Sequence, residues 1–82
     1  MFLAKVRVML KPTVNDPEGI TIARALKRLE FDSVDSLRTG KYFELRVDAA
    51  SASDAEKQVD EMCKKLLANP VIETYSFDLA PV

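Results

Sequence analysis

Hydrophobic and polar residues alternate along several stretches of the chain. Residues 3–11 place apolar side chains on one face and mostly cationic ones on the other: Ala4, Val6, Val8 and Leu10 against Lys5, Arg7, Met9 and Lys11. This period of two predicts a β-strand with one buried face. Pro12 has no N–H to donate to a neighbouring strand, so we expect the strand to end there.

The next stretch has helical rather than alternating spacing. Asp16 is suited to cap a helix, and Pro17 suits its first position, where a missing N–H costs nothing. Apolar residues then recur three and four positions apart, which predicts a helix over 17–29: Ile22, Ala25, Leu26 and Leu29. Gly19 is unusual inside it. Either the first turn is loose, or another part of the chain packs closely on this backbone.

A β-hairpin is expected over residues 33–38 and 41–48. Phe43, Leu45 and Val47 alternate cleanly with polar neighbours in the second arm. The first arm is weaker, because Val34 and Leu37 lie three apart, and a bulge would reconcile them with a strand. Thr39-Gly40 would form the turn, since glycine can adopt a positive φ.

A second helix and a final strand complete the pattern. Ser53 and Glu56 fit a capping box at the start of the helix, and Asn69-Pro70 ends it. The apolar stripe of this helix consists of Ala55, Val59, Met62, Cys63 and Leu66. Residues 71–79 then predict a strand whose inner face carries Val71, Tyr75, Phe77 and Leu79.

The predicted element order is β-α-β-β-α-β in a single domain spanning residues 1–82. Its natural architecture is an α+β two-layer sandwich of the ferredoxin-like kind, an antiparallel sheet with both helices on one face. The other face would present a mixture of charged, polar and apolar side chains, among them Arg7, Met9 and Tyr42. In so small a chain, this mixture predicts a surface for a partner, most simply a second copy.

Composition narrows the class of function. The chain has 82 residues, 12 Lys+Arg against 13 Asp+Glu, one Cys and no His. The balanced charge argues against nucleic-acid binding, and the absence of long apolar runs argues against a membrane span or a signal peptide. A cytoplasmic location is therefore expected. One Cys excludes an internal disulfide.

The same inventory argues against an independent enzyme. Without His there is neither the commonest general base nor the commonest metal ligand. The only glycines are Gly19 and Gly40, so no glycine-rich phosphate loop exists. Cys63 lies on the apolar stripe, which favours a core thiol over a reactive one. We therefore expect no catalytic residue, metal site or cofactor site in this chain.

Three turns carry the remaining candidate residues. Arg38, Gly40 and Lys41 could form either a solvated hairpin tip or a contact for an anion or a partner. Asp16-Pro17 is explained by helix capping, and Asn69-Pro70 by a helix stop. Taken one at a time, these signals indicate only a small α+β domain.

Taken together and in order, the segments resemble the PurS family, the small subunit of phosphoribosylformylglycinamidine (FGAM) synthase. The resemblance covers nearly the whole chain and rests on Lys11-Pro12, Val14, Asp16-Pro17, Gly19, Ala25-Leu26, Arg38, Gly40-Lys41 and residues 62–75. Glu30-Phe31 departs from it, because Gly-Phe is expected there. A glycine would end the helix in the left-handed conformation, which a Glu adopts only with strain.

The resemblance implies a role in de novo purine synthesis. The complex converts formylglycinamide ribonucleotide, glutamine and ATP into the amidine. A glutaminase subunit releases ammonia, and a larger synthetase subunit uses ATP and Mg²⁺. The small subunit has no catalytic group of its own; it joins the other two subunits as a homodimer, or as a tetramer of two dimers, and assists ammonia transfer. On this interpretation, the partner contacts are Asp16, Pro17, Arg38, Gly40, Lys41, Asn69 and Pro70.

Two other classes of function compete with this interpretation. Ferredoxin-like sandwiches often dimerise and bind small effectors, so a sensor or regulatory domain is the main alternative. Effector-dependent shifts in melting temperature would distinguish it. An RNA-binding sheet is disfavoured, because Tyr42 is the only aromatic residue expected on the outer face.

Overall fold

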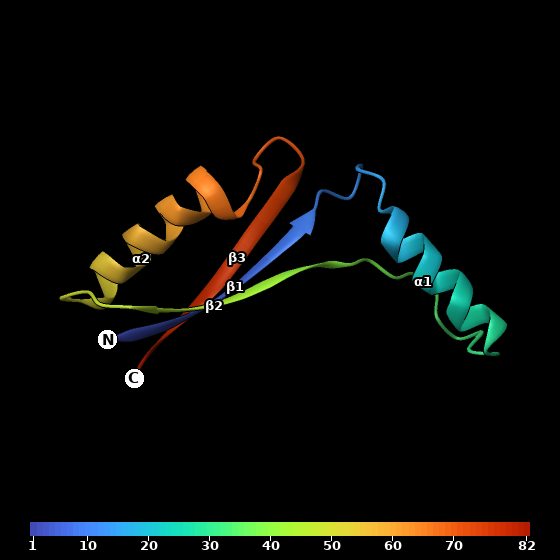
Figure 1. Cartoon of the computed structure of the whole chain (residues 1–82), viewed down its shortest axis with the longest axis horizontal. Coiled ribbons are helices and arrows are strands. Elements are labelled where there is room, and N and C mark those ends of the chain that lie inside the picture. Colours follow the sequence, from blue (N-terminus) through green and yellow to red (C-terminus); the bar gives the residue numbers. More distant parts are fainter.

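An antiparallel sheet of three strands forms the centre of the molecule (Figure 1). The computed structural model describes residues 1–82. The central strand β1 (Phe2–Leu10) pairs with β2 (Gly40–Val47) on one side and β3 (Glu73–Pro81) on the other. Val6 lies opposite Phe43 in one register and Phe77 in the other, so the predicted apolar faces of the strands coincide.

One face of this sheet is covered by α2 (Ala52–Met62), which a π-helical turn, η1 (Cys63–Leu67), extends. The helix packs against β1 and β3. The buried core lies between these layers and consists of Ala4, Val6, Val8, Val47, Val59, Cys63 and Ala68. The prediction of Ser53 as the cap was wrong: Ser51 is the N-cap, and its hydroxyl accepts from the Asp54 N–H. The Ser51–Asp54 pair has the same three-residue spacing as the predicted Ser53–Glu56 pair, and the helix therefore begins two residues earlier than predicted.

The other helix, α1 (Pro17–Arg28), lies beyond the end of the sheet, on the opposite side of the molecule from α2 (Figure 1). The Cα radius of gyration is 16.1 Å, compared with about 12 Å for a compact chain of this length. The α+β class, the antiparallel sheet and the two helices are confirmed. The expectation that both helices of one chain lie on one face of its sheet is corrected, since α1 extends away from that sheet and leaves Ile22 and Leu29 exposed.

The predicted strand over 33–38 was also wrong. These residues form no strand, and β2 starts directly at Gly40. The weak alternation at Val34 and Leu37 is the physical reason, because neither register would bury both side chains on one face. Residues 29–39 instead carry the chain back from the far end of α1 to the sheet (Figure 1).

The end of α1 bears on the departure noted at Glu30. Leu29 is the C-cap, and Glu30 adopts a φ of 72°. The Phe31 N–H donates to Leu26 O and the Glu30 N–H to Lys27 O, each at 3.0 Å. This pair of bonds is a Schellman motif. The helix therefore ends as a glycine-capped helix would, with Glu30 in the conformation that favours glycine.

The last connection shifts the final strand. Residues 69–73 form a turn in which the Ile72 and Glu73 N–H groups donate to Asn69 O. The strand predicted over 71–79 therefore runs from Glu73 to Pro81, and Val71 is exposed. No helix of the structure has the length and apolar character needed to cross a membrane.

Candidate functional site

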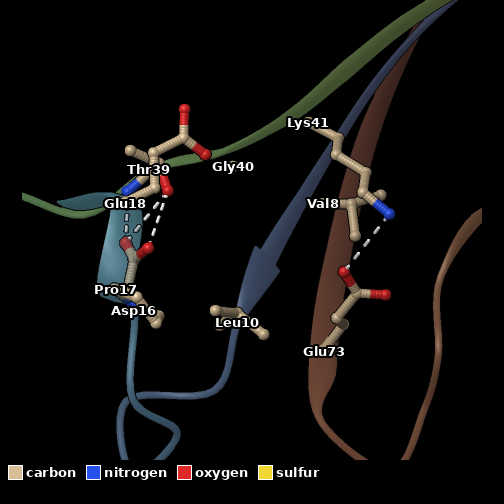
Figure 2. A pocket seen from close by; sticks show the side chains of 9 residues that line it. All are labelled: Val8, Leu10, Asp16, Pro17, Glu18, Thr39, Gly40, Lys41 and Glu73. Atoms are coloured by element: carbon tan, nitrogen blue, oxygen red, sulfur yellow. Dashed lines mark hydrogen bonds and ion pairs between the residues drawn. The ribbon is translucent and has the colours of Figure 1, made fainter.

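The predicted turn residues gather at one end of the sheet, where β1 ends and β2 and β3 begin. Asp16, Pro17, Gly40 and Lys41 line a hollow of about 430 Å³ there, together with Glu73 (Figure 2). Asn69 is joined to this group through Glu73, whose Oε1 accepts from the Asn69 N–H at 2.7 Å. The structure thus brings together turns that are more than 50 residues apart in sequence. We call this group of turns the junction.

Asp16 is the most constrained of these residues. Its side chain is buried, with only 4% of the residue exposed. Oδ2 accepts from the Thr39 N–H at 2.7 Å, and Oδ1 accepts from the Gly19 N–H at 3.0 Å and from the Thr39 hydroxyl at 2.9 Å. These donors favour the charged carboxylate, so they hold the pKa of Asp16 below its ordinary value, with the Thr39 N–H contributing most. The predicted helix cap is confirmed, and it also ties α1 to the start of β2.

Close packing explains Gly19. A Cβ at this position would lie 2.5 Å from Asp16 Oδ2 and 3.1 Å from Leu37 O. Of the two explanations left open by the sequence, the structure therefore supports close approach to this backbone. The carboxylate that caps the helix and the returning chain both occupy the space that a side chain would need.

Gly40 has a related role, and the predicted reason for it was wrong. No glycine of the chain has a positive φ, and Gly40 opens β2 rather than forming a hairpin turn. A Cβ there would lie 2.6 Å from Val8 O and would collide with the Met9 sulfur. Gly40 is therefore required by the neighbouring strand β1.

Arg38 is used within the chain. Its Nη2 donates to Lys11 O at 3.0 Å and to Val14 O at 2.9 Å. The guanidinium therefore satisfies carbonyl groups of the loop that leaves β1. Asp16 and Arg38 together fasten both chain segments that connect α1 to the sheet.

Lys41 remains accessible. Its Nζ lies 3.8 Å from Glu73 Oε2, and 62% of its side chain is exposed, whereas only 12% of the Glu73 side chain is. The ammonium group thus points toward Glu73, a weak ion-pair partner, while most of the Lys41 side chain stays exposed (Figure 2). Lys41 is therefore a charged group of this junction that a second protein could reach, as is the exposed Glu18 that lines the same hollow.

Outside this junction, Asp60 and Cys63 contribute to the packing of α2 and η1 on the sheet. The Tyr75 hydroxyl donates to Asp60 Oδ1 at 2.5 Å, and Lys64 Nζ lies 2.9 Å from Asp60 Oδ2, which links α2 to β3. The Tyr75 hydrogen bond is the main reason why the pKa of Asp60 is lowered. Cys63 is fully buried, and burial raises the pKa of its thiol, as expected for a core cysteine.

Two central residues were missed in the sequence. Thr39 supplies two donors to Asp16, and Glu73 connects Lys41 with Asn69. The sequence pattern predicts a hairpin turn at Thr39, and nothing in that local pattern points to a residue 23 positions away. Glu73 lies inside the segment that carries the family resemblance, which was the available signal.

Comparison with known proteins identifies the family. The sequence model of PurS, described as phosphoribosylformylglycinamidine (FGAM) synthase, matches residues 3–81. The FGAM synthase subunit PurS of Archaeoglobus fulgidus is 46% identical over 74 residues, covering 90% of this chain and 92% of that protein. The crystal structure of Bacillus subtilis PurS is 42% identical, with a TM-score of 0.88 over 99% of this chain and all of that one.

A further solved structure matches nearly the whole chain. A chain in the structure of PurLQS from Thermotoga maritima is 33% identical, with a TM-score of 0.87 over 98% of this chain and 99% of that chain. The extended arrangement of α1 and the sheet is therefore matched along the full chain in experimental structures. These matches and the junction of turns lead to one conclusion: the chain belongs to the PurS family, the small subunit of FGAM synthase.

Proposed function

We propose that this chain is a non-catalytic adaptor that docks the glutaminase and synthetase subunits of FGAM synthase and helps ammonia to pass between them. It would bind no cofactor itself, while the synthetase subunit uses ATP and Mg²⁺ in the cytoplasm. Ammonia released into bulk water is lost by dilution and protonation, so the two active sites need a fixed mutual position. The observation that carries the proposal is the junction of turns, which is fastened internally by Asp16 and Arg38 and presents Lys41 to the outside.

The contact site would consist of the three turns, with their residues in two roles. Asp16, Arg38 and Gly40 hold the backbone in place, whereas Lys41 is positioned to donate to a partner carboxylate or carbonyl. Pro17 and Pro70 are exposed and give the neighbouring surface a fixed backbone. Asn69 sets the shape of the last turn through its bonds to residues 71–73.

Reconstitution tests this function. The two larger subunits would be assayed for amidine formation from glutamine and from ammonia, with and without this chain. We expect glutamine-dependent activity to require the chain and ammonia-dependent activity to persist without it. Equal glutamine-dependent rates in both mixtures would refute the adaptor role.

A charge reversal tests the contact site. Lys41→Glu should weaken assembly with the larger subunits, and Arg24→Glu provides a matched reversal on an exposed position of α1. Both variants should keep the circular dichroism of the wild type, because neither side chain is buried. Lys41→Glu should lower the melting temperature slightly, because it places a second carboxylate beside Glu73. Wild-type assembly by folded Lys41→Glu would exclude Lys41 from the contact.

We also propose that the chain acts as a homodimer in which each copy covers the apolar surface that the other leaves open. α2 packs on β1 and β3, and a groove of about 540 Å³ remains between β2 and α2, lined in part by Leu45, Met62, Leu66 and Leu67. The exposed stripe of α1 offers the complementary apolar surface, with Ile22 38% and Leu29 67% exposed. Only ten of 82 residues are buried in the single chain, which is a small core on which to fold alone.

Sedimentation measurements test the dimer. The wild type should sediment as a species of twice the 9.2 kDa monomer mass. Ile22→Gln should weaken the dimer about tenfold, since burying the exposed 38% of Ile22 in both copies would contribute about 1–2 kcal/mol. Arg24→Gln, on the polar side of the same helix, should leave it unchanged. Identical dimer affinity for Ile22→Gln and wild type would rule out α1 as the dimer contact.

A further inference from the structure

Two chain segments connect α1 to the sheet, and side-chain hydrogen bonds join each segment to the other. The outgoing segment, residues 11–16, ends with Asp16, which accepts the N–H and the hydroxyl of Thr39. The returning segment, residues 29–39, contains Arg38, which donates to Lys11 O and Val14 O. We call the set of Asp16, Arg38 and Thr39 the bracket.

The bracket is the main tie that fixes the direction of α1. The helix extends beyond the sheet and leaves its apolar stripe exposed, so packing within the chain does little to hold it (Figure 1). Gly19 lets the two segments approach each other, because a Cβ there would lie 2.5 Å from Asp16 Oδ2 and 3.1 Å from Leu37 O. Gly19 and the polar bonds thus act on the same two connecting segments, residues 11–16 and 29–39, which we call the neck.

We propose that Asp16 and Thr39 are positioning residues that hold α1 as a preset arm and thereby set the affinity of the second copy. This inference rests on the proposed homodimer. A helix that is already oriented loses little freedom on binding, whereas a freely pivoting helix must be ordered at that step. None of the three bracket residues belongs to the core between α2 and the sheet, so opening the bracket should affect association more than the folding of the sheet.

Thr39→Val is the sharpest variant. It keeps the β-branched shape and the backbone N–H, and it removes the hydroxyl that contacts both Asp16 oxygens at 2.9 and 3.0 Å. We expect the dimer dissociation constant to rise about tenfold, as for loss of one hydrogen bond to a charged group. Thr39→Ser should restore wild-type affinity, and Thr74→Val, an exposed threonine on β3, should have no effect.

Arm orientation can be measured independently of dimerisation. Spin labels on Arg24→Cys in α1 and Glu56→Cys in α2 would report the distance between the helices, with labelled chains diluted in unlabelled ones and the native Cys63 buried. We expect a narrow distance distribution in the wild type. A broader distribution in Thr39→Val, with unchanged amide protection of β1, would support the bracket. Unchanged distance distribution and affinity in Thr39→Val would overturn it.

The two proposals fail separately. If the wild type is a monomer at all concentrations, the homodimer is wrong, and the distance distributions of the monomer still decide whether Thr39 holds the arm. If the wild type dimerises and Thr39→Val dimerises equally well with a fixed arm, only the bracket is wrong.

Discussion

Replacing Gly19 with alanine separates two physical arguments by the sign of its effect. Glycine inside a helix costs about 0.5–1 kcal/mol relative to alanine, so helix propensity predicts that Gly19→Ala stabilises the protein. The structure predicts the reverse. The new Cβ would lie 2.5 Å from Asp16 Oδ2 and 3.0 Å from Asp16 Cγ, which is too close for a real contact.

The size of the effect follows from what must move. The Asp16 carboxylate is held by the N–H and the hydroxyl of Thr39, so displacing it sacrifices at least one hydrogen bond to a charged group. Such a bond contributes about 1.5–3 kcal/mol, and the gain in propensity offsets up to about 1 kcal/mol of that loss. We therefore expect Gly19→Ala to lower the free energy of unfolding by about 1–2 kcal/mol.

Urea unfolding followed by circular dichroism, at one fixed protein concentration, measures this difference. The control is the same substitution in an Asp16→Ala background, where the obstructing carboxylate is gone and Leu37 O at 3.1 Å is the remaining close atom. There, Gly19→Ala should be neutral or stabilising. If Gly19→Ala stabilises the otherwise wild-type protein, the close approach of Asp16 has no energetic weight and our reasoning fails.

Three further predictions concern the helix end, the core and acid stability. Glu30→Gly should raise the urea midpoint, because the left-handed conformation costs a residue with a side chain about 1–2 kcal/mol. The greater freedom of glycine in the unfolded chain offsets only about half of that gain. An unchanged or lower midpoint would contradict this prediction. Val59→Ala, at a fully buried position, should lower the free energy of unfolding by about 2 kcal/mol in the same assay. Val71→Ala, at a position 76% exposed, should change it by less than about 0.5 kcal/mol. Equal losses for the two variants would contradict the observed core. Because the pKa of Asp16 is lowered in the folded protein, its stabilising effect is present above the ordinary value of 3.8 and disappears as the pH falls through the folded value. The stability difference between wild type and Asp16→Asn should therefore shrink below about pH 4 in acid titrations, and a constant difference would refute the assignment.

The sheet could be predicted from sequence because alternation reports burial directly. Val6 and Val8 sit on the predicted inner face of β1, and Phe43 and Leu45 on that of β2. Asp16-Pro17 located the start of α1 to the residue, since capping depends on local chemistry alone. Errors occurred where two local signals competed, as at the second helix, where Ser51 and Ser53 each have an acidic residue three positions later.

The junction could be predicted only in part. The turns were recognised as important, but the partners of their side chains lie far away in sequence, as Thr39 does from Asp16 and Glu73 from Lys41. No spacing rule connects such pairs, because their contact is created by the antiparallel pairing of β1 with both neighbours. The family resemblance marked these segments without stating which atoms meet.

The position of α1 shows why a correct pattern led to a wrong placement within the chain. An amphipathic stripe indicates that a helix face will be buried, and it contains no information on whether the covering surface belongs to the same chain. The predicted sandwich assumed that both helices cover their own sheet. The neck residues decide otherwise, since Asp16 and Arg38 fasten both connecting segments so that α1 leads away from that sheet. On the proposed homodimer, a second copy covers the exposed stripe, and the polar contacts of the neck serve assembly by orienting the apolar residues of α1.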